Sequence, residues 1–122
     1  MKFPEEFLHF IWQFRLYNSL QLYTATGQPI EVVRPGTLNK NAGPDFLHAK
    51  LIIDKTIWIG NVEIHLNSSD WIVHRHQYDN AYDNVILHVV YVHDKPIYRT
   101  DGTLIPVLVL KDQFSDQYFE PR

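Results

Sequence analysis

Two runs of β-forming residues separated by only two residues constrain the fold of this chain more than any other feature. Residues 46–53 and 56–66 are rich in isoleucine and leucine, and Asp54 and Lys55 connect them. So short a connection joins antiparallel strands, because a parallel pair needs a crossover of a dozen or more residues. The sequence therefore predicts a long antiparallel hairpin over these two runs.

The amino-terminal segment has the pattern of an amphipathic helix over residues 4–18. A proline suits the first turn, and the two glutamates after it oppose the positive end of the helix dipole. Phe7, Ile11 and Phe14 recur at helical spacing and form one apolar stripe. We expect this stripe to pack against the sheet.

Further β-type runs extend the hairpin into a sheet. We expect a first hairpin from residues 20–23 and 30–33, a loop over 34–44, an irregular segment with one short helix over 67–82, a central strand over 85–93 and a third hairpin from 97–99 and 104–110. A chain of 122 residues suffices for one domain with a single core. The predicted fold class is therefore α/β (α+β): one domain over residues 1–122, with a mixed β-sheet built from hairpins and an N-terminal helix packed on it.

Composition excludes several classes of protein. Without cysteine the chain forms no disulfide, no thiolate metal site and no cysteine nucleophile. A formal net charge of −3 gives no support to tight non-specific binding to DNA. Acidic residues stand where a secretory signal would be basic, and no long uncharged apolar run follows them. We therefore expect a cytoplasmic protein without a membrane segment.

The residues that could perform chemistry gather in the second half of the long hairpin. In the run 62–66, Glu63 and His65 alternate with apolar residues and therefore point to one face, roughly 6.6 Å apart along the strand. A carboxylate beside an imidazole could bind a metal ion or form an oriented general base. The alternative is that both lie on the exposed face of an edge strand.

Asp45 precedes the first strand of the hairpin and could join this pair. Simple pairing across the two-residue turn sets Phe46 opposite Glu63 and directs Asp45 to the other face. A one-residue bulge at Gly60 and Asn61 would bring Asp45 to the face of Glu63. We expect such a bulge, because glycine and asparagine are suited to it.

The motif Gly43-Pro44-Asp45, followed across the hairpin by Glu63-Ile64-His65, resembles the PD-(D/E)XK motif of the restriction-endonuclease-like nucleases. The resemblance implies a restriction-endonuclease-like core and a site for Mg²⁺ or Mn²⁺ held by Asp45, Glu63 and the carbonyl of Ile64. It also implies nucleic acid as substrate and a carboxylate on the first helix, for which Glu6 is the nearest match. His65 stands where the motif has lysine, so the resemblance assigns the attacking water to a histidine that lacks a permanent charge.

A second resemblance covers nearly the whole chain. It rests on residues 41–46, 60–65 and 69–71, on His74 and His76, and on residues 7–13 and 85–90. These segments are similar to an uncharacterised bacterial family, domain of unknown function 2851. Members of that family are longer, which implies that this chain is the N-terminal part of a larger protein.

Histidines supply the remaining candidate ligands. His74 and His76, two residues apart in an extended chain, would share a face and could bind a transition metal, with His65 or His88 as a third ligand. The same residues could instead contact a substrate phosphate. His88 lies among apolar residues of the predicted central strand, where a hydrogen-bonded core histidine is the alternative.

Three functional hypotheses follow. The first is a divalent-metal-dependent phosphodiesterase acting on nucleic acid, with Asp45, Glu63 and His65 as catalytic residues. The second is a non-catalytic interaction module on a nuclease-like scaffold. The third is a histidine-rich transition-metal-binding protein.

Overall fold

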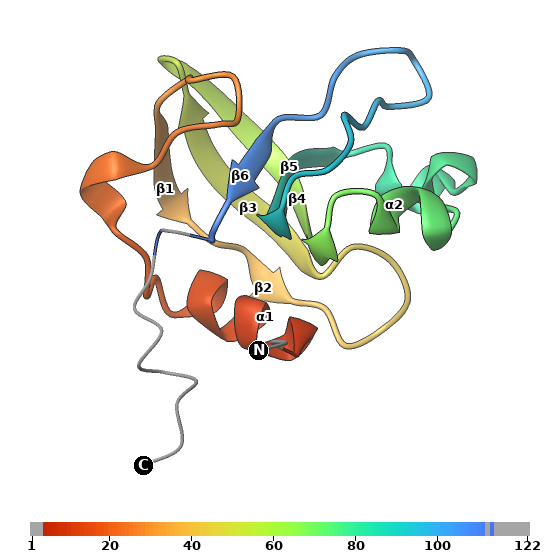
Figure 1. Cartoon of the computed structure of the whole chain (residues 1–122), viewed down its shortest axis with the longest axis horizontal. Coiled ribbons are helices and arrows are strands. Elements are labelled where there is room, and N and C mark those ends of the chain that lie inside the picture. The colour runs from red at the N-terminus through yellow and green to blue at the C-terminus, as the bar shows by residue number, and fades with distance from the viewer. Residues whose placement is uncertain (1–3, 112, 114–122) are drawn as a thin grey trace.

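The computed structural model describes residues 4–111 and 113, which form a curled mixed sheet with helical segments around it (Figure 1). The sheet order is β1-β3-β4-β5-β6, and β2 pairs with β3 as well. The elements are α1 (Glu5–Gln13), η1 (Ser19–Gln21), β1 (Ile30–Arg34), β2 (Thr37–Leu38), β3 (Phe46–Ile53), β4 (Thr56–Asn67), α2 (Asp70–Val73), η2 (His76–Tyr78), η3 (Asn80–Tyr82), β5 (Val85–Val92) and β6 (Val107–Val109), where η marks a 3-10 helix.

The long hairpin is confirmed as β3 and β4. The two strands are antiparallel, with Ile53 opposite Thr56, and Asp54 and Lys55 form the two-residue turn. Both turn residues have positive φ, 49° and 70°. Two-residue turns with positive φ at both positions are common in hairpins, because their backbone twist matches that of the flanking strands.

The predicted bulge exists, but it lies in the other strand. Phe46 pairs with Val62, and Ala49 pairs with Gly60. Between these two pairs, β3 contains one residue more than β4. The bulge in β3 contains His48, whose φ of 60° lies in the left-handed region found in bulges. The expectation of a bulge at Gly60 and Asn61 is therefore wrong in position, and the register shifts by one residue in the opposite sense.

Gly60 is glycine for a different reason. A Cβ atom at Gly60 would lie 2.6 Å from the Asn84 carbonyl oxygen and 2.6 Å from Ile86 Cγ2. The start of β5 thus passes so close to β4 that no side chain fits between them. β5 then runs parallel to β4, with Glu63 opposite His88, and β6 is parallel to β5.

Helix α1 is shorter than predicted, and its buried face is rotated. It ends at Gln13, after which Arg15 adopts a left-handed φ of 57°. Leu8, Ile11 and Trp12 are fully buried, whereas Phe14 is 55% exposed. Ile11 therefore packs as expected, but the placement of Phe14 in the core is wrong, because the buried face of the helix runs through Leu8, Ile11 and Trp12.

The two outer hairpins are smaller than predicted. Residues 20–23 form no strand, and a single bridge joins Tyr23 to Pro29. β1 pairs with β3 instead, and the expected loop over 34–44 contains β2. The third hairpin also closes through one bridge, Tyr98 to Leu104, before the chain continues into β6.

The second half of strand β4 is covered on both faces, since the four consecutive residues 62–65 are buried, whereas residues 56–59 are exposed. Val62 and Ile64 belong to the main hydrophobic core, which also contains Leu8, Ile11 and Trp12 of α1. A second core, formed by Trp71, Tyr82, Val85, Ile97 and Ile105, lies apart from the first. The mixed sheet with an N-terminal helix agrees with the predicted fold class. Within the described residues, none of the helices has both the length and the apolar character that crossing a membrane requires.

Candidate functional site

Glu63 and His65 are buried at the centre of the sheet. β4 lies between β3 and β5, and the two residues are only 4% and 1% exposed. The alternative that they occupy the exposed face of an edge strand is therefore wrong. A carboxylate and an imidazole at this depth require polar partners, because burying an unpaired polar group is costly.

Asp45 lies directly beside Glu63. The backbone N–H of Asp45 donates to Glu63 Oε1 at 3.1 Å, and the N–H of Ile64 donates to Asp45 Oδ2 at 2.8 Å. The bulge in β3 thus brings the two carboxylate residues together, as the sequence pattern suggested. Burial raises the pKa of the Asp45 carboxyl, and the nearby charge of Glu63 raises it further although His9 opposes this.

The second carboxylate oxygen of Glu63 faces two imidazoles. Glu63 Oε2 lies 3.2 Å from His65 Nε2 and 2.9 Å from His76 Nε2. Burial alone would raise the pKa of the Glu63 carboxyl, but these contacts outweigh burial and lower its pKa to about 2. The contact with His76 is short without having the geometry of a hydrogen bond, so His76 Nε2 is buried with no hydrogen-bond partner among the described residues.

A left-handed residue, not an extended strand, brings His74 and His76 together. His74 caps the end of α2, and Arg75 then turns the chain with φ 61° and ψ 30° before His76 begins η2. The start of α2 is anchored to the end of β5, because Ser68 Oγ and Ser69 Oγ both donate to the Asp94 carboxylate. This anchor positions the helix, and with it both histidines, over β4.

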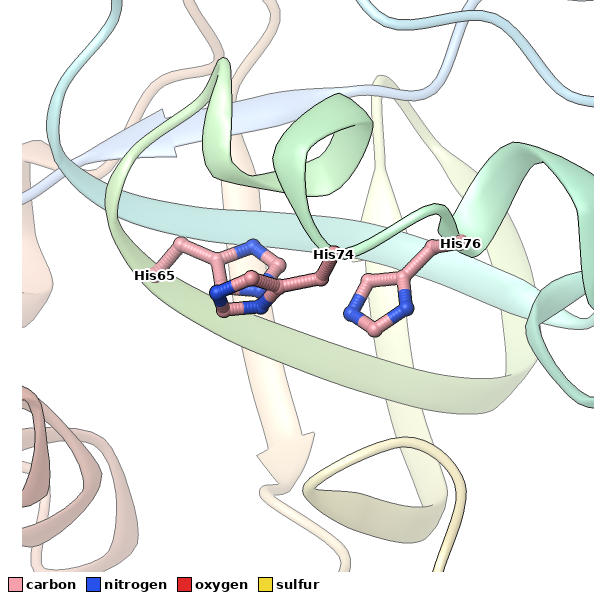
Figure 2. Close-up of side chains that lie close together, drawn as sticks. All are labelled: His65, His74 and His76. Carbon is pink, nitrogen blue, oxygen red and sulfur yellow. The ribbon is translucent and has the colours of Figure 1, made fainter.

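His65, His74 and His76 form what we call the histidine cluster (Figure 2). The His65 ring comes from β4, and the other two rings come from the chain immediately after α2 (Figure 2). One ring nitrogen from each residue lies within 4.8 Å of the others. His65 is buried, His76 is half-buried and His74 is exposed, so the cluster has one side toward solvent.

His88 lies behind the histidine cluster. Its side chain is fully buried, and its Nε2 atom is 2.8 Å from His65 Nδ1. Burial lowers the pKa of His88 to about 3, and the neighbouring His65 contributes to the decrease. His88 is therefore neutral at physiological pH. It is a hydrogen-bonded core histidine, and its partner is a member of the histidine cluster.

Two residues that sequence reasoning missed lie on the other side of Asp45. His9 Nε2 lies 3.4 Å from Asp45 Oδ2, and Glu5 completes a group whose ligand atoms are all within 4.8 Å of one another. Glu6, the expected helix carboxylate, is exposed. The available signal was the i, i+4 spacing of Glu5 and His9, which places both side chains on one helix face.

Three other basic or imidazole side chains lie outside the histidine cluster. Lys50 pairs with Ile59, four residues from Glu63 along β4, or roughly 13 Å. His48 is exposed at the bulge. His93 Nδ1 lies 3.0 Å from Ser68 Oγ and contributes to the anchor of α2.

The curled mixed sheet and its N-terminal helix make the chain an α+β domain. The buried carboxylate of Glu63 lies between three histidines that could hold a metal ion and a second acidic residue, Asp45. The chain belongs to the family described as protein of unknown function (DUF2851), whose family model matches residues 5–121. Searches of curated proteins and of solved structures returned no match.

Proposed function

We propose that this domain binds a transition-metal ion of the zinc class through His65, His74 and His76, with Glu63 as a fourth ligand. The observation that carries the proposal is the convergence of three imidazoles, with a carboxylate oxygen of Glu63 3.2 Å and 2.9 Å from the Nε2 atoms of two of them. Only the His74 side opens to solvent. Zinc binds histidine nitrogens and carboxylate oxygens, and its sites with four protein ligands are tetrahedral.

The distances support this ligand set. A tetrahedral ion with metal–nitrogen bonds of about 2.0–2.1 Å places its ligand atoms roughly 3.3 Å apart. Glu63 Oε2 is already 3.2 Å and 2.9 Å from the Nε2 atoms of His65 and His76. His74 is the exposed member of the histidine cluster, so rotation of its ring supplies the remaining adjustment.

The surroundings of the ligands support the proposal as well. The His65 Nδ1 atom faces His88 Nε2, which leaves His65 Nε2 as the ligand atom. Metal-bound histidines usually donate their other ring N–H to a fixed acceptor, and a neutral His88 is such an acceptor. Glu63 is held in the same way, because its Oε1 atom accepts the Asp45 N–H.

Three nitrogen ligands favour zinc, copper, nickel or iron over magnesium and calcium, which prefer oxygen. With four protein ligands such an ion would have no open position for water, so it would supply a structural link between β4 and the chain after α2. The domain's own residues would orient the site: Glu63 offsets charge, His88 holds the His65 ring, and Tyr82 stacks on His76 with ring centroids 3.7 Å apart.

Zinc binding tests the proposal. Protein stripped of metal by a chelator is titrated with Zn²⁺ against a competing dye, and Co²⁺ is added separately to obtain a visible ligand-field spectrum. His74→Asn and His76→Asn should weaken zinc binding by more than the about 10–100-fold caused by changes outside the ligand shell. His48→Asn is the matched control, because His48 is exposed and lies outside the cluster. Equal zinc affinity in all four proteins contradicts the proposal.

The second candidate function is a metal-dependent phosphodiesterase acting on nucleic acid. The contact between Asp45 and Glu63 favours it, because two carboxylates at the end of a hairpin are a cation site of the nuclease type. Mg²⁺ or Mn²⁺ would be held by both carboxylates and by the carbonyl of Ile64. We place that carbonyl on the side of Asp45, since the N–H of Ile64 points there and both groups of a strand residue face the same neighbour.

Cleavage of DNA and RNA in the presence of Mn²⁺ or Mg²⁺ tests this candidate. Asp45→Asn and Glu63→Gln should abolish cleavage, whereas His65→Lys should raise it if the histidine substitutes for the motif lysine. If the wild-type protein cleaves neither polymer with either ion, the phosphodiesterase is excluded. If in addition it binds no zinc, the non-catalytic interaction module becomes the function that the fold supports.

A further inference from the structure

A second group of ligand side chains lies near Glu63 and shares no residue with the histidine cluster. Glu5 and His9 extend from α1, and Asp45 precedes β3. One ligand atom from each residue lies within 4.8 Å of the other two, and all three side chains are partly buried. We call this group the helix-edge triad. None of its members belongs to the histidine cluster.

The fold assembles the helix-edge triad from three independent features. The i, i+4 spacing places Glu5 and His9 on the same face of α1. The packing of Leu8 into the main core holds that face toward the sheet. The bulge in β3 places Asp45 beside β4, where the Ile64 N–H donates a hydrogen bond of 2.8 Å to its carboxylate.

The charges of the helix-edge triad are incompletely compensated. Glu5 and Asp45 are two carboxylates, and no lysine or arginine within residues 4–111 forms an ion pair with either of them, whereas His9 pairs with Asp45. His9 Nε2 is buried, yet at 3.4 Å from Asp45 Oδ2 it has no hydrogen-bond partner in the described part of the chain. Two carboxylates facing a buried nitrogen without a partner suit a cation, because a cation satisfies all three at once.

We propose that Glu5, His9 and Asp45 form a second divalent-cation site, distinct from the histidine cluster. Two oxygen ligands and one imidazole suit Mn²⁺ and comparable ions better than the nitrogen-rich cluster does. Glu63 lies between the two sites, with Oε2 toward His65 and His76 and Oε1 accepting the Asp45 N–H. The domain therefore holds two different cations side by side.

This inference is independent of zinc binding at the histidine cluster, and two titrations separate them. The full chain is first given one equivalent of Zn²⁺, and Mn²⁺ is then titrated while free Mn²⁺ is followed by electron paramagnetic resonance. Wild-type protein should bind one equivalent of Mn²⁺ in addition to the zinc. His74→Asn should lose zinc binding and retain Mn²⁺ binding.

Substitutions in α1 locate the second site. Glu5→Gln and His9→Gln should each weaken Mn²⁺ binding by more than about tenfold. Glu6→Gln is the matched control, because Glu6 is the neighbouring glutamate in the same helix turn and is exposed. Circular dichroism confirms that the variants fold, and neither substitution in α1 touches the buried face of Leu8, Ile11 and Trp12.

Three outcomes overturn the proposal. The first is that wild-type protein binds no Mn²⁺ once zinc is present. The second is that Glu6→Gln reduces Mn²⁺ binding as much as Glu5→Gln does. The third is that His74→Asn abolishes the binding of both ions, which would mean that they share one site.

Discussion

Replacement of His88 by leucine isolates the role of the buried contact between two histidines. His88 and His65 are 0% and 1% exposed, so no water reaches His65 Nδ1 when its partner is removed. Leucine fills most of the space and cannot accept a hydrogen bond. The change therefore removes one interaction, the 2.8 Å contact between His88 Nε2 and His65 Nδ1, and leaves the proposed ligands in place.

The expected loss of zinc affinity follows from that interaction. Acceptors that orient a metal-bound histidine are worth about 10–100-fold in metal affinity, or roughly 1.4–2.7 kcal/mol. Stability should change less, because two effects oppose each other. An unsatisfied His65 Nδ1 costs about 1–3 kcal/mol. Leucine, however, also removes His88 Nδ1, which is itself buried without a partner among the described residues.

The assay compares zinc affinity and stability in the same set of variants. Zinc affinity is measured by competition with a chelating dye, and the free energy of unfolding of the metal-free protein is measured in urea. His88→Gln, whose amide oxygen can accept the His65 N–H, should recover part of the affinity that His88→Leu loses. If His88→Leu binds zinc as tightly as the wild type, the proposed role of His88 in orienting the His65 ring is refuted.

Three further predictions concern folding. Ile11→Ala should lower the free energy of unfolding in urea by about 2–5 kcal/mol, because Ile11 is fully buried. Phe14→Ala should lower it clearly less, since Phe14 is 55% exposed. Equal losses would contradict the packing of α1. Gly60→Ala should destabilise by about 1–3 kcal/mol in the same assay, because its Cβ would lie 2.6 Å from the Asn84 carbonyl oxygen, and an unchanged midpoint would show that β5 moves aside. The pKa of Asp94 is lowered from 3.8, mainly by the hydroxyl of the second serine before α2; this contribution to stability is present above pH 3.8 and is lost as pH falls through the lower folded pKa. Asp94→Asn should therefore lower the melting temperature at pH 7 and converge on the wild type in strong acid, and a constant difference across the pH range would refute it.

The elements that local sequence determines were predicted well. The hairpin of β3 and β4 follows from two β-forming runs and a two-residue turn. The structure contains this hairpin, and β4 extends one residue further than predicted, to Asn67. The existence of α1 follows from its apolar spacing. The short helix after β4 and the strand β5 were also expected. In each case the deciding interactions lie between residues close together in the chain.

Boundaries and registers were predicted less well, because distant contacts decide them. The length of α1 depends on where Arg15 turns, and its guanidinium donates to the carbonyls of Val32 and Val33 in β1. The bulge lies at His48 and not at Gly60, and Gly60 instead allows the start of β5 to pass close to β4. The strand expected at residues 20–23 is absent: its first two residues belong to η1, and the next two meet the start of β1 through the Tyr23 bridge to Pro29 and the Ile30 N–H bond to the Leu22 carbonyl.

For the candidate site, the sequence by itself determined which side chains are available: no cysteine, an alternating Glu63 and His65, and histidines two residues apart at 74 and 76. Only the tertiary structure decided which of them meet. His65 and His88 come together because β5 returns parallel to β4, and His9 reaches Asp45 because α1 packs across the sheet. The residue types can be read directly from the sequence. The contacts between side chains 23 or 36 positions apart depend on strand register and helix packing, and these are decided by interactions across the whole fold.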